Sequence, residues 1–270
     1  MIFQKISPGH RLSPFISFFY LIEVSPQRLP LVFDYLPNGT SSMVFVCKGK
    51  FSLYNNRHKG ETLPASYVFG CQPESFYFSV NEPLTLFGID FTPYGLHLIT
   101  GMSVKDLTGS FCALDVLFGR EGKELTNQIM KAKDICEKVT LIESFLIKLF
   151  ITRYKPLPVI INAVDLVKNI HGRIRMSSLS ASLETGERQL ERIFNRAVGL
   201  SPKLFAQITR FNYIFKLLKD CPNVDFQDIA FICGYYDQNH LIKEFKQFAG
   251  VTPSEYLKNN HELANHFLVS

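Results

Sequence analysis

Cysteine and histidine are the residues of this chain that could most directly bind a metal or act as nucleophiles. The six cysteines lie far apart, and no two share a Cys-x-x-Cys spacing. Disulfide frameworks belong to small secreted chains and zinc sites usually show close cysteine pairs, so we expect reduced thiols, most of them buried. The histidines of the N-terminal half are isolated as well: His10, His58 and His97.

Metalloenzymes gather histidine and carboxylate ligands, and this pattern does not indicate such a cluster. The chain also lacks a Gly-x-Ser-x-Gly elbow, a phosphate-binding glycine loop and a dinucleotide fingerprint. We therefore predict that the protein is not an enzyme and has no cofactor and no metal site.

The composition is that of a folded globular protein without a membrane span. The 270 residues are 46% hydrophobic and 20% charged, which fits one or two domains. No apolar run approaches the roughly 18 residues of a spanning helix, and Met1–Lys5 does not begin a signal peptide, so we expect a cytoplasmic protein. The net charge of +5 permits nucleic-acid binding, but residues 158–270 hold 13 Lys and Arg against 11 Asp and Glu, so charge does not mark a binding half.

Two prolines, Pro156 and Pro158, interrupt a helical pattern and divide the chain into residues 1–155 and 156–270. Upstream, residues 30–92 contain short aromatic and β-branched runs separated by turn signals such as Asn38-Gly39, a pattern typical of an antiparallel barrel or sandwich. An amphipathic helix is expected over residues 138–154. The predicted strands are Met43–Cys47, Phe51–Tyr54, Tyr67–Gly70, Phe76–Val80 and Leu84–Phe91.

The C-terminal part contains an internal repeat with an offset of 51 residues. Its leucine and phenylalanine share one helix face, its glycine fits a left-handed helix stop, and its proline begins the next helix. Short apolar segments, 178–183 and 226–234, precede the two repeats, which gives two helix-turn-helix motifs, and residues 202–220 are predicted to form one long helix between them. The matched residues are Leu190, Phe194, Gly199 and Pro202 in the first unit and Leu241, Phe245, Gly250 and Pro253 in the second.

The segment Gly234–Tyr256 closely resembles the signature of the AraC/XylS family of bacterial transcription regulators, and Glu187–Phe194 with Gly199–Lys203 resembles the first motif of the same branch. This resemblance covers residues 160 to 260. The N-terminal segments 13–16, 36–39, 70–73 and 87–95 are similar to that branch's effector-type domain. The resemblance implies an α+β protein: a cupin-like β-barrel with flanking helices, then an all-α domain with two helix-turn-helix motifs. It also implies a DNA-binding regulator, more often an activator, that works with RNA polymerase.

The resemblance assigns the DNA-reading side chains as well. These residue types can read base edges, since arginine pairs with guanine, Gln and Asn with adenine, Glu with cytosine, and Ile with the thymine methyl. The two helices would enter adjacent major grooves about 34 Å apart. Lys203 and Lys246 would add phosphate affinity, and His240 is expected to pack or to contact the backbone. The assigned residues are Arg188, Glu191 and Arg192 in the first helix and Gln238, Asn239, Ile242 and Lys243 in the second.

The first motif departs from the family pattern at its turn. Glu184 stands where glycine is common, and Gly186 replaces the serine that usually caps the recognition helix. Replacing a hydroxyl cap by glycine costs only a few tenths of a kcal/mol, about 0.3 kcal/mol. These departures affect the geometry of the turn but not the assignment of this segment as the first helix-turn-helix motif.

Several alternatives remain open at this point. The N-terminal half could be a metal-dependent cupin enzyme fused to a DNA-binding module, or the chain could be an alkyl-transfer repair protein with a zinc-bound cysteine cluster. The aromatic strands suit a pocket for a small-molecule effector and equally suit a packed core, in which case this half would only dimerise. The sequence does not identify the effector, the target genes, the direction of regulation or the oligomeric state. A homodimer and a monomer with two DNA-reading helices are both physically reasonable.

Overall fold

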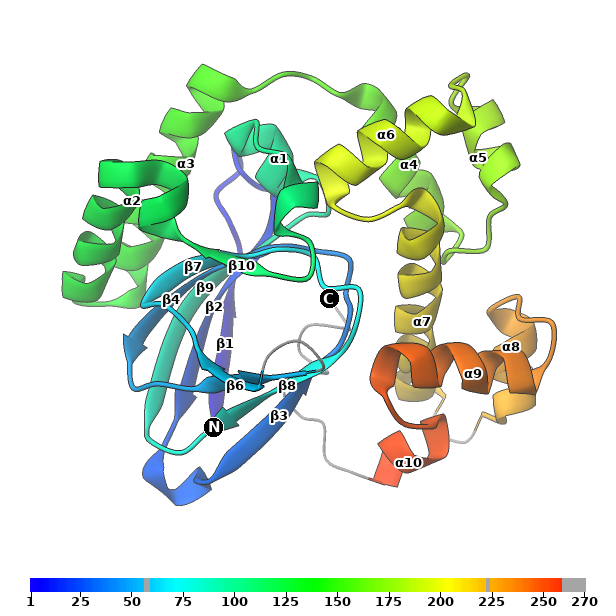
Figure 1. The fold of residues 1–270 in the computed structure, drawn as a ribbon, viewed down its shortest axis with the longest axis horizontal. Helices are drawn as coiled ribbons and strands as arrows, with labels where there is room; N and C mark the ends of the chain where they lie inside the picture. The colour runs from blue at the N-terminus through cyan, green and yellow to red at the C-terminus, as the bar shows by residue number, and fades with distance from the viewer. Residues whose placement is uncertain (56–58, 222–223, 259–270) are drawn as a thin grey trace.

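The computed structural model describes residues 1–55, 59–221 and 224–258, and Figure 1 shows a β-sheet half followed by a helical half. The strands all pair antiparallel and lie before residue 114. Their bounds are β1 (Ile2–Ile6), β2 (Ile16–Val24), β3 (Leu31–Tyr35), β4 (Ser42–Lys48), β5 (Ser52–Tyr54), β6 (Lys59–Thr62), β7 (Ser66–Phe69), β8 (Phe76–Val80), β9 (Leu84–Phe91) and β10 (Phe111–Ala113).

The strands form two sheets that pack face to face. The larger sheet has the order β1-β2-β9-β4-β7-β10 and the smaller one β3-β8-β5-β6. Successive side chains of a strand point to opposite faces, so Phe18 and Tyr20 of β2 join the core between the sheets, while Phe19 points to the other face. The five strands predicted from aromatic and β-branched runs all exist as β4, β5, β7, β8 and β9.

The expected cupin-like barrel does not close. Among the described residues no strand pairing joins the two sheets, so the half is a sandwich with open edges. The strands β10 and β6 at two of these edges have three and four residues, which leaves little backbone for extending the ladder into the other sheet.

Three helices cover the outer face of the larger sheet, as Figure 1 shows. They are α1 (Gly95–Thr100), α2 (Leu114–Lys131), whose backbone departs from helical geometry at Gly119, and α3 (Ile135–Arg153). The helix predicted over residues 138–154 is α3, which begins three residues earlier because Asp134 caps it by accepting a hydrogen bond from the Glu137 amide. A short 3-10 helix, η2 (Val104–Leu107), lies between α1 and β10.

The C-terminal half is all helical and repeats one plan twice. The predicted long helix is α7, with the predicted bounds and a length of about 28 Å at 1.5 Å per residue. Figure 1 places α6 beside one end of α7 and α9 across the other. The helices are α4 (Pro158–Asn169), α5 (Met176–Ser182), α6 (Glu187–Val198), α7 (Pro202–Asp220), α8 (Phe226–Ile232), α9 (Gln238–Ala249) and α10 (Pro253–Lys258).

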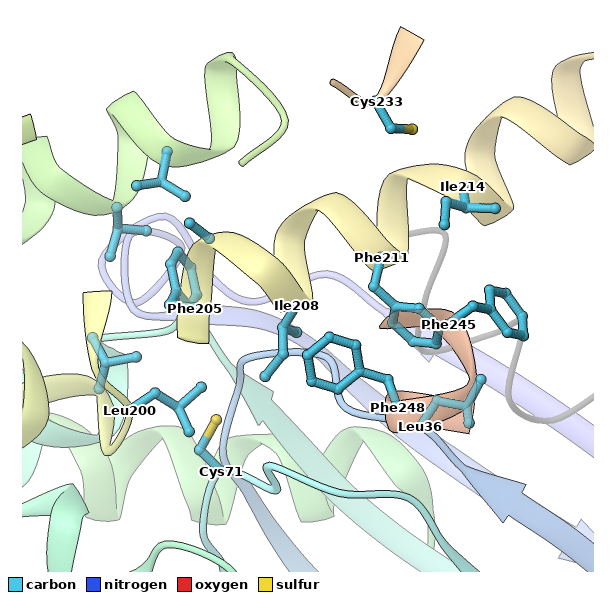
Figure 2. Packing of buried hydrophobic residues seen from close by; sticks show 14 of the residues in the cluster. Leu36, Cys71, Leu200, Phe205, Ile208, Phe211, Ile214, Cys233, Phe245 and Phe248 are labelled. Carbon is cyan, nitrogen blue, oxygen red and sulfur yellow. The ribbon is translucent and has the colours of Figure 1, made fainter. Parts of the chain in front are cut away.

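The two halves share a hydrophobic core along α7. Leu36, from the turn between β3 and β4, and Cys71 are buried in the same cluster as the apolar face of α7, and Figure 2 shows both below Ile208. The neighbouring Gly39 lies so close to Phe205 that a Cβ atom there would come within 2.9 Å of the ring. The β-sheet half is therefore packed directly against the helix that joins the two helix-turn-helix motifs.

All six cysteines are free thiols in the structure, but the expectation that most are buried is wrong. Cys71 and Cys233 are buried because they face the α7 core, whereas Cys136 and Cys221 lie on exposed helix ends. Across the described ranges, no helix is both long enough and apolar enough to cross a membrane.

Candidate nucleic-acid interface

The first helix-turn-helix motif consists of α5 and α6, joined by residues 183–186. Leu190 and Phe194 of α6 are buried, because the i, i+4 spacing puts both on the face that packs against the core. Helix α6 ends at Gly199, whose φ of 85° is the left-handed conformation predicted for a helix stop. The side chains assigned to DNA by the family resemblance lie on the opposite face and are exposed: Arg188, Glu191 and Arg192.

The turn of this motif carries both departures from the family pattern. Glu184 has a φ of 49°, a left-handed conformation that glycine adopts more easily. Gly186 occupies the N-cap position of α6 and supplies no side-chain hydrogen bond to the helix. The family's glycine therefore fits the backbone of position 184 better than the glutamate of this chain.

The second motif, α8 and α9, is capped more completely. The Asp237 carboxylate accepts a hydrogen bond from the His240 amide at 2.7 Å and so begins α9. At its other end Gly250 has a φ of 78°, and Thr252 with Glu255 forms a capping box at the start of α10.

The assigned residues of α9 do not all have the same exposure. Gln238, Asn239 and Lys243 are exposed, whereas Ile242 is half-buried and packs against the hydrophobic core. The exposed ring of His240 makes an edge contact with Tyr235 at a centroid distance of 5.3 Å, in keeping with the packing role expected for it.

Aromatic contacts attach both recognition helices to α7. Phe194 of α6 packs against Phe205 with ring centroids 5.3 Å apart. Phe245 of α9 packs against Phe211 at 5.2 Å, and Figure 2 shows these two rings in contact along α7. Tight packing of this kind restricts the relative movement of the two helices.

A buried ion pair, which the sequence analysis missed, also joins α9 to α7. Glu244 is 4% exposed and receives two hydrogen bonds from Arg210 Nη2, at 2.6 and 2.9 Å, and one from the Tyr235 hydroxyl at 2.8 Å. Desolvation lowers the pKa of Arg210, but its hydrogen bonds and the charge of Glu244 outweigh that and raise the pKa overall. The signal was available, because Glu244 lies on the apolar stripe of α9 between Leu241 and Phe245, where a charge requires a partner.

The N-terminal half contains an apolar cavity between its sheets. It has a volume of about 40 Å³ and is lined by aromatic side chains including Tyr20, Phe51, Tyr67 and Phe78. Pockets for drug-sized ligands measure about 300–1,000 Å³, so in this conformation the cavity has room for little more than water. The aromatic strand residues therefore serve as packed core here.

The histidines of the N-terminal half do not gather. His97 Nδ1 lies 2.6 Å from the Met102 carbonyl oxygen, and burial lowers the pKa of the imidazole; His10 is exposed. His58 lies outside the described residues. Within the described ranges, no three His, Cys, Asp or Glu side chains form a group that could hold a metal ion.

Two family models match the chain, one on each half. A model described as a helix-turn-helix domain matches residues 179–259, and a model described as a domain of unknown function (DUF6597) matches residues 4–113. Among curated proteins, the uncharacterized HTH-type transcriptional regulator YidL of Escherichia coli K12 is 28% identical over 101 residues. That alignment covers 36% of this chain and 34% of YidL.

Two solved structures are also similar to this chain. ToxT of Vibrio cholerae aligns over 89% of this chain and 97% of its own, with 16% identity and a TM-score of 0.49. An AraC-type transcriptional regulator from Chromobacterium violaceum aligns over 36% of this chain and 88% of its own, with 23% identity and a TM-score of 0.34.

The tandem motifs and their family match define a helix-turn-helix transcription regulator. The C-terminal half therefore carries a helix-turn-helix domain of the kind found in AraC-type regulators, and the N-terminal half carries a DUF6597 domain. The matched curated relative is described as a transcriptional regulator and the matched C-terminal domain as a helix-turn-helix domain, which favours a regulator over a cupin metalloenzyme or an alkyl-transfer repair protein.

Proposed function

We propose that the chain binds duplex DNA sequence-specifically by placing α6 and α9 in two adjacent major grooves. The base-reading side chains would be Arg188, Glu191 and Arg192 of α6, with Gln238, Asn239, Ile242 and Lys243 of α9. Lys203 and Lys246, both exposed, would add contacts to phosphates. Residues 1–155 would form a control domain and residues 156–270 the DNA-binding domain. The protein would act in the cytoplasm.

One observation carries the proposal: each recognition helix buries its Leu and Phe face against α7 and leaves the face with the assigned polar residues exposed. Among the described residues, Glu191 forms no ion pair with Arg188 or Arg192, so these side chains are available for base edges. Ile242 is the exception, since its half-buried side chain has less surface to offer a thymine methyl.

The role of the N-terminal half is part of the same proposal. We infer that it controls the DNA-binding half, through a small-molecule effector or through dimerisation, and that the regulator activates transcription with RNA polymerase. An effector would have to displace aromatic side chains to enlarge the 40 Å³ cavity. A thermal-shift screen against metabolites tests this, because a ligand selective for the folded state raises the melting temperature. A chain that stays dimeric in solution and responds to no metabolite supports dimerisation instead.

The DNA-binding proposal is tested by selecting random duplexes with the purified full chain. The expected result is an asymmetric motif of two boxes about 10 base pairs apart, since one helical turn separates adjacent grooves on one face. The double variant Arg188→Ala/Lys243→Ala removes one contact from each helix and should enrich no such motif. Each lost contact should weaken binding to the selected site by about 1–3 kcal/mol.

A variant with changes outside these helices serves as the control. Lys123→Gln and Lys131→Gln alter exposed lysines of α2 and should leave the selected motif unchanged. Normal selection by the Arg188→Ala/Lys243→Ala variant would show that α6 and α9 are not the reading helices. Transcription in vitro from a promoter with the selected site then distinguishes activation from repression.

A further inference from the structure

The first recognition helix shares a groove with the N-terminal half. This groove has a volume of about 580 Å³ and lies between η2 and α6. Figure 1 shows the C-terminal end of α6 next to α1, the helix that precedes η2 in the chain. The groove is lined by Ser103 and Lys105 from the N-terminal half and by Arg188, Glu191, Arg192, Asn195 and Arg196 from α6.

The groove is strongly positive. Lys105, Arg188, Arg192 and Arg196 are all exposed and face a single carboxylate, that of Glu191. Within the described part of the chain, none of the four cations is occupied in an ion pair. Asp106 follows Lys105 in the sequence, but it does not line the groove. Four positive charges against one negative charge leave the groove with a net charge of +3, which favours a polyanion as partner.

The position of Lys105 relative to α6 is fixed by tight packing. The Thr108 hydroxyl donates a hydrogen bond to the Gly199 carbonyl oxygen at 2.6 Å. Val104 is fully buried, and its Cγ1 would lie 3.0 Å from a Cβ atom at Gly199. Only glycine therefore permits this close approach, and η2 cannot shift without breaking the contact.

The groove continues the surface through which α6 is proposed to read DNA. Arg188, Glu191, Arg192 and Asn195 follow the i, i+3, i+4, i+7 spacing of one helix face, and all four line the groove. In the proposed complex, the DNA backbone bordering the major groove would pass the C-terminal end of α6, against which the segment of η2 packs. A flexible lysine can meet such a phosphate as a point charge.

We propose that Lys105 contacts the DNA backbone, so that the N-terminal half contributes directly to the protein–DNA interface of α6. This inference rests on the proposed function. It gives the N-terminal half a physical means of control, because any change that separates Thr108 from Gly199 also withdraws a phosphate contact from the DNA.

The test measures the affinity of the full chain for its selected duplex and for a scrambled duplex across a range of salt concentrations. The logarithm of the binding constant falls with the logarithm of the salt concentration by about 0.9 per phosphate contact. Lys105→Gln should reduce that slope by about 0.9 and weaken binding about 5- to 10-fold at 0.1 M salt, equally on both duplexes. Lys105→Arg keeps the charge and should retain the slope, and Lys123→Gln is the matched control on α2.

The outcomes separate the two proposals. An unchanged slope in Lys105→Gln, or tighter binding by this variant, would overturn the phosphate contact while leaving the DNA-reading role of α6 intact. By contrast, Arg188→Ala should lose affinity mainly for the selected duplex. Normal binding of that duplex by Arg188→Ala would count against the proposed reading face itself, whatever Lys105 does.

Discussion

At the residue scale, Glu184 holds a backbone conformation that its side chain disfavours. Its φ of 49° lies in the left-handed region, which costs residues other than glycine about 1–2 kcal/mol. The side chain is exposed and is not needed for packing. The residue lies in the turn between α5 and α6, so the backbone strain is located within the first helix-turn-helix motif.

Glu184→Gly should therefore stabilise the protein by about 0.5–1 kcal/mol, since relief of the left-handed strain exceeds the greater entropy of glycine in the unfolded chain. Urea unfolding followed by far-UV circular dichroism measures the difference. Glu187→Gly is the control, because it removes a glutamate from the first turn of α6, where glycine lowers stability. If both variants lose the same free energy of unfolding, residue 184 does not have a left-handed backbone conformation.

Asp90 is a second residue whose environment predicts a measurable effect. It is buried in β9, and its Oδ1 accepts hydrogen bonds from the hydroxyls of Thr40 at 2.9 Å and Ser42 at 3.0 Å. Burial raises the pKa of Asp90 to about 7, and the two hydrogen bonds offset only part of this effect. Thr40 follows the Asn38-Gly39 turn that packs against α7, so this carboxyl group supports the segment between the two halves.

The raised pKa predicts that stability falls as the pH rises from about 4 to 7. In this window folded Asp90 keeps a proton that the unfolded chain, with a pKa of about 3.9, releases. This group's contribution is thus complete below pH 4 and is lost as the pH rises through about 7. Asp90→Asn keeps an oxygen acceptor but carries no charge. The free energy of unfolding of this variant, relative to that of the native chain, should therefore be about 2–3 kcal/mol higher at pH 8 than at pH 5.

Unfolding both proteins in urea at the two pH values provides the measurement. If the difference in unfolding free energy between the variant and the native chain is the same at pH 5 and pH 8, Asp90 is ionised in the folded protein throughout this range.

At the scale of elements, a buried ion pair adds to the aromatic contacts that attach α9 to α7. Glu244 and Arg210 have exposed side-chain fractions of 4% and 15%, and Arg210 also lies 4.3 Å from the ring centroid of Tyr235. Removing one partner leaves the other charge without a counter-ion in a largely buried position. Replacing both partners by apolar residues leaves no charge that needs one.

Glu244→Ala should lower the free energy of unfolding by up to about 3–5 kcal/mol, because the half-buried Arg210 then has no counter-ion. The double variant Glu244→Leu/Arg210→Met should recover much of this loss. Glu121→Ala breaks the exposed pair with Lys148 and should leave the stability nearly unchanged. If Glu244→Ala behaves like Glu121→Ala, the pair does not hold α9 in place.

Elements were predictable where the sequence pattern is local. The repeated glycines and prolines define the ends of α6, α7 and α9 because they act through the backbone of their own turn. The nine-residue strand β2 was not predicted, since its apolar run fills both faces and shows no alternation. Helix α2 was also missed, because Gly119 and Gly122 lie within it and α2 changes direction at Gly119.

At the scale of the molecule, the junction between the halves joins residues far apart in the chain. Thr108 and Gly199 are 91 positions apart, and Leu36 reaches a core formed by residues after 158. Such pairings follow from the complete fold and leave no periodic signal in the sequence. The two helix-turn-helix motifs could thus be located from the sequence, whereas the position of Lys105 beside α6 could not.

The shared core predicts that the β3–β4 turn and α7 open together. Leu36→Ala should lower the unfolding free energy by about 2–5 kcal/mol, the range for a buried leucine that leaves a cavity, and should speed amide hydrogen exchange in α7 as well as in the turn. Leu53→Ala is the matched control, because Leu53 is equally buried but lies between the two sheets, away from α7. It should cost similar stability without faster local exchange in α7. Faster exchange in the turn alone after Leu36→Ala would show that the β3–β4 turn and α7 open independently, and the coupling of Lys105 to α6 would then depend on the contacts of Val104 and Thr108 with Gly199.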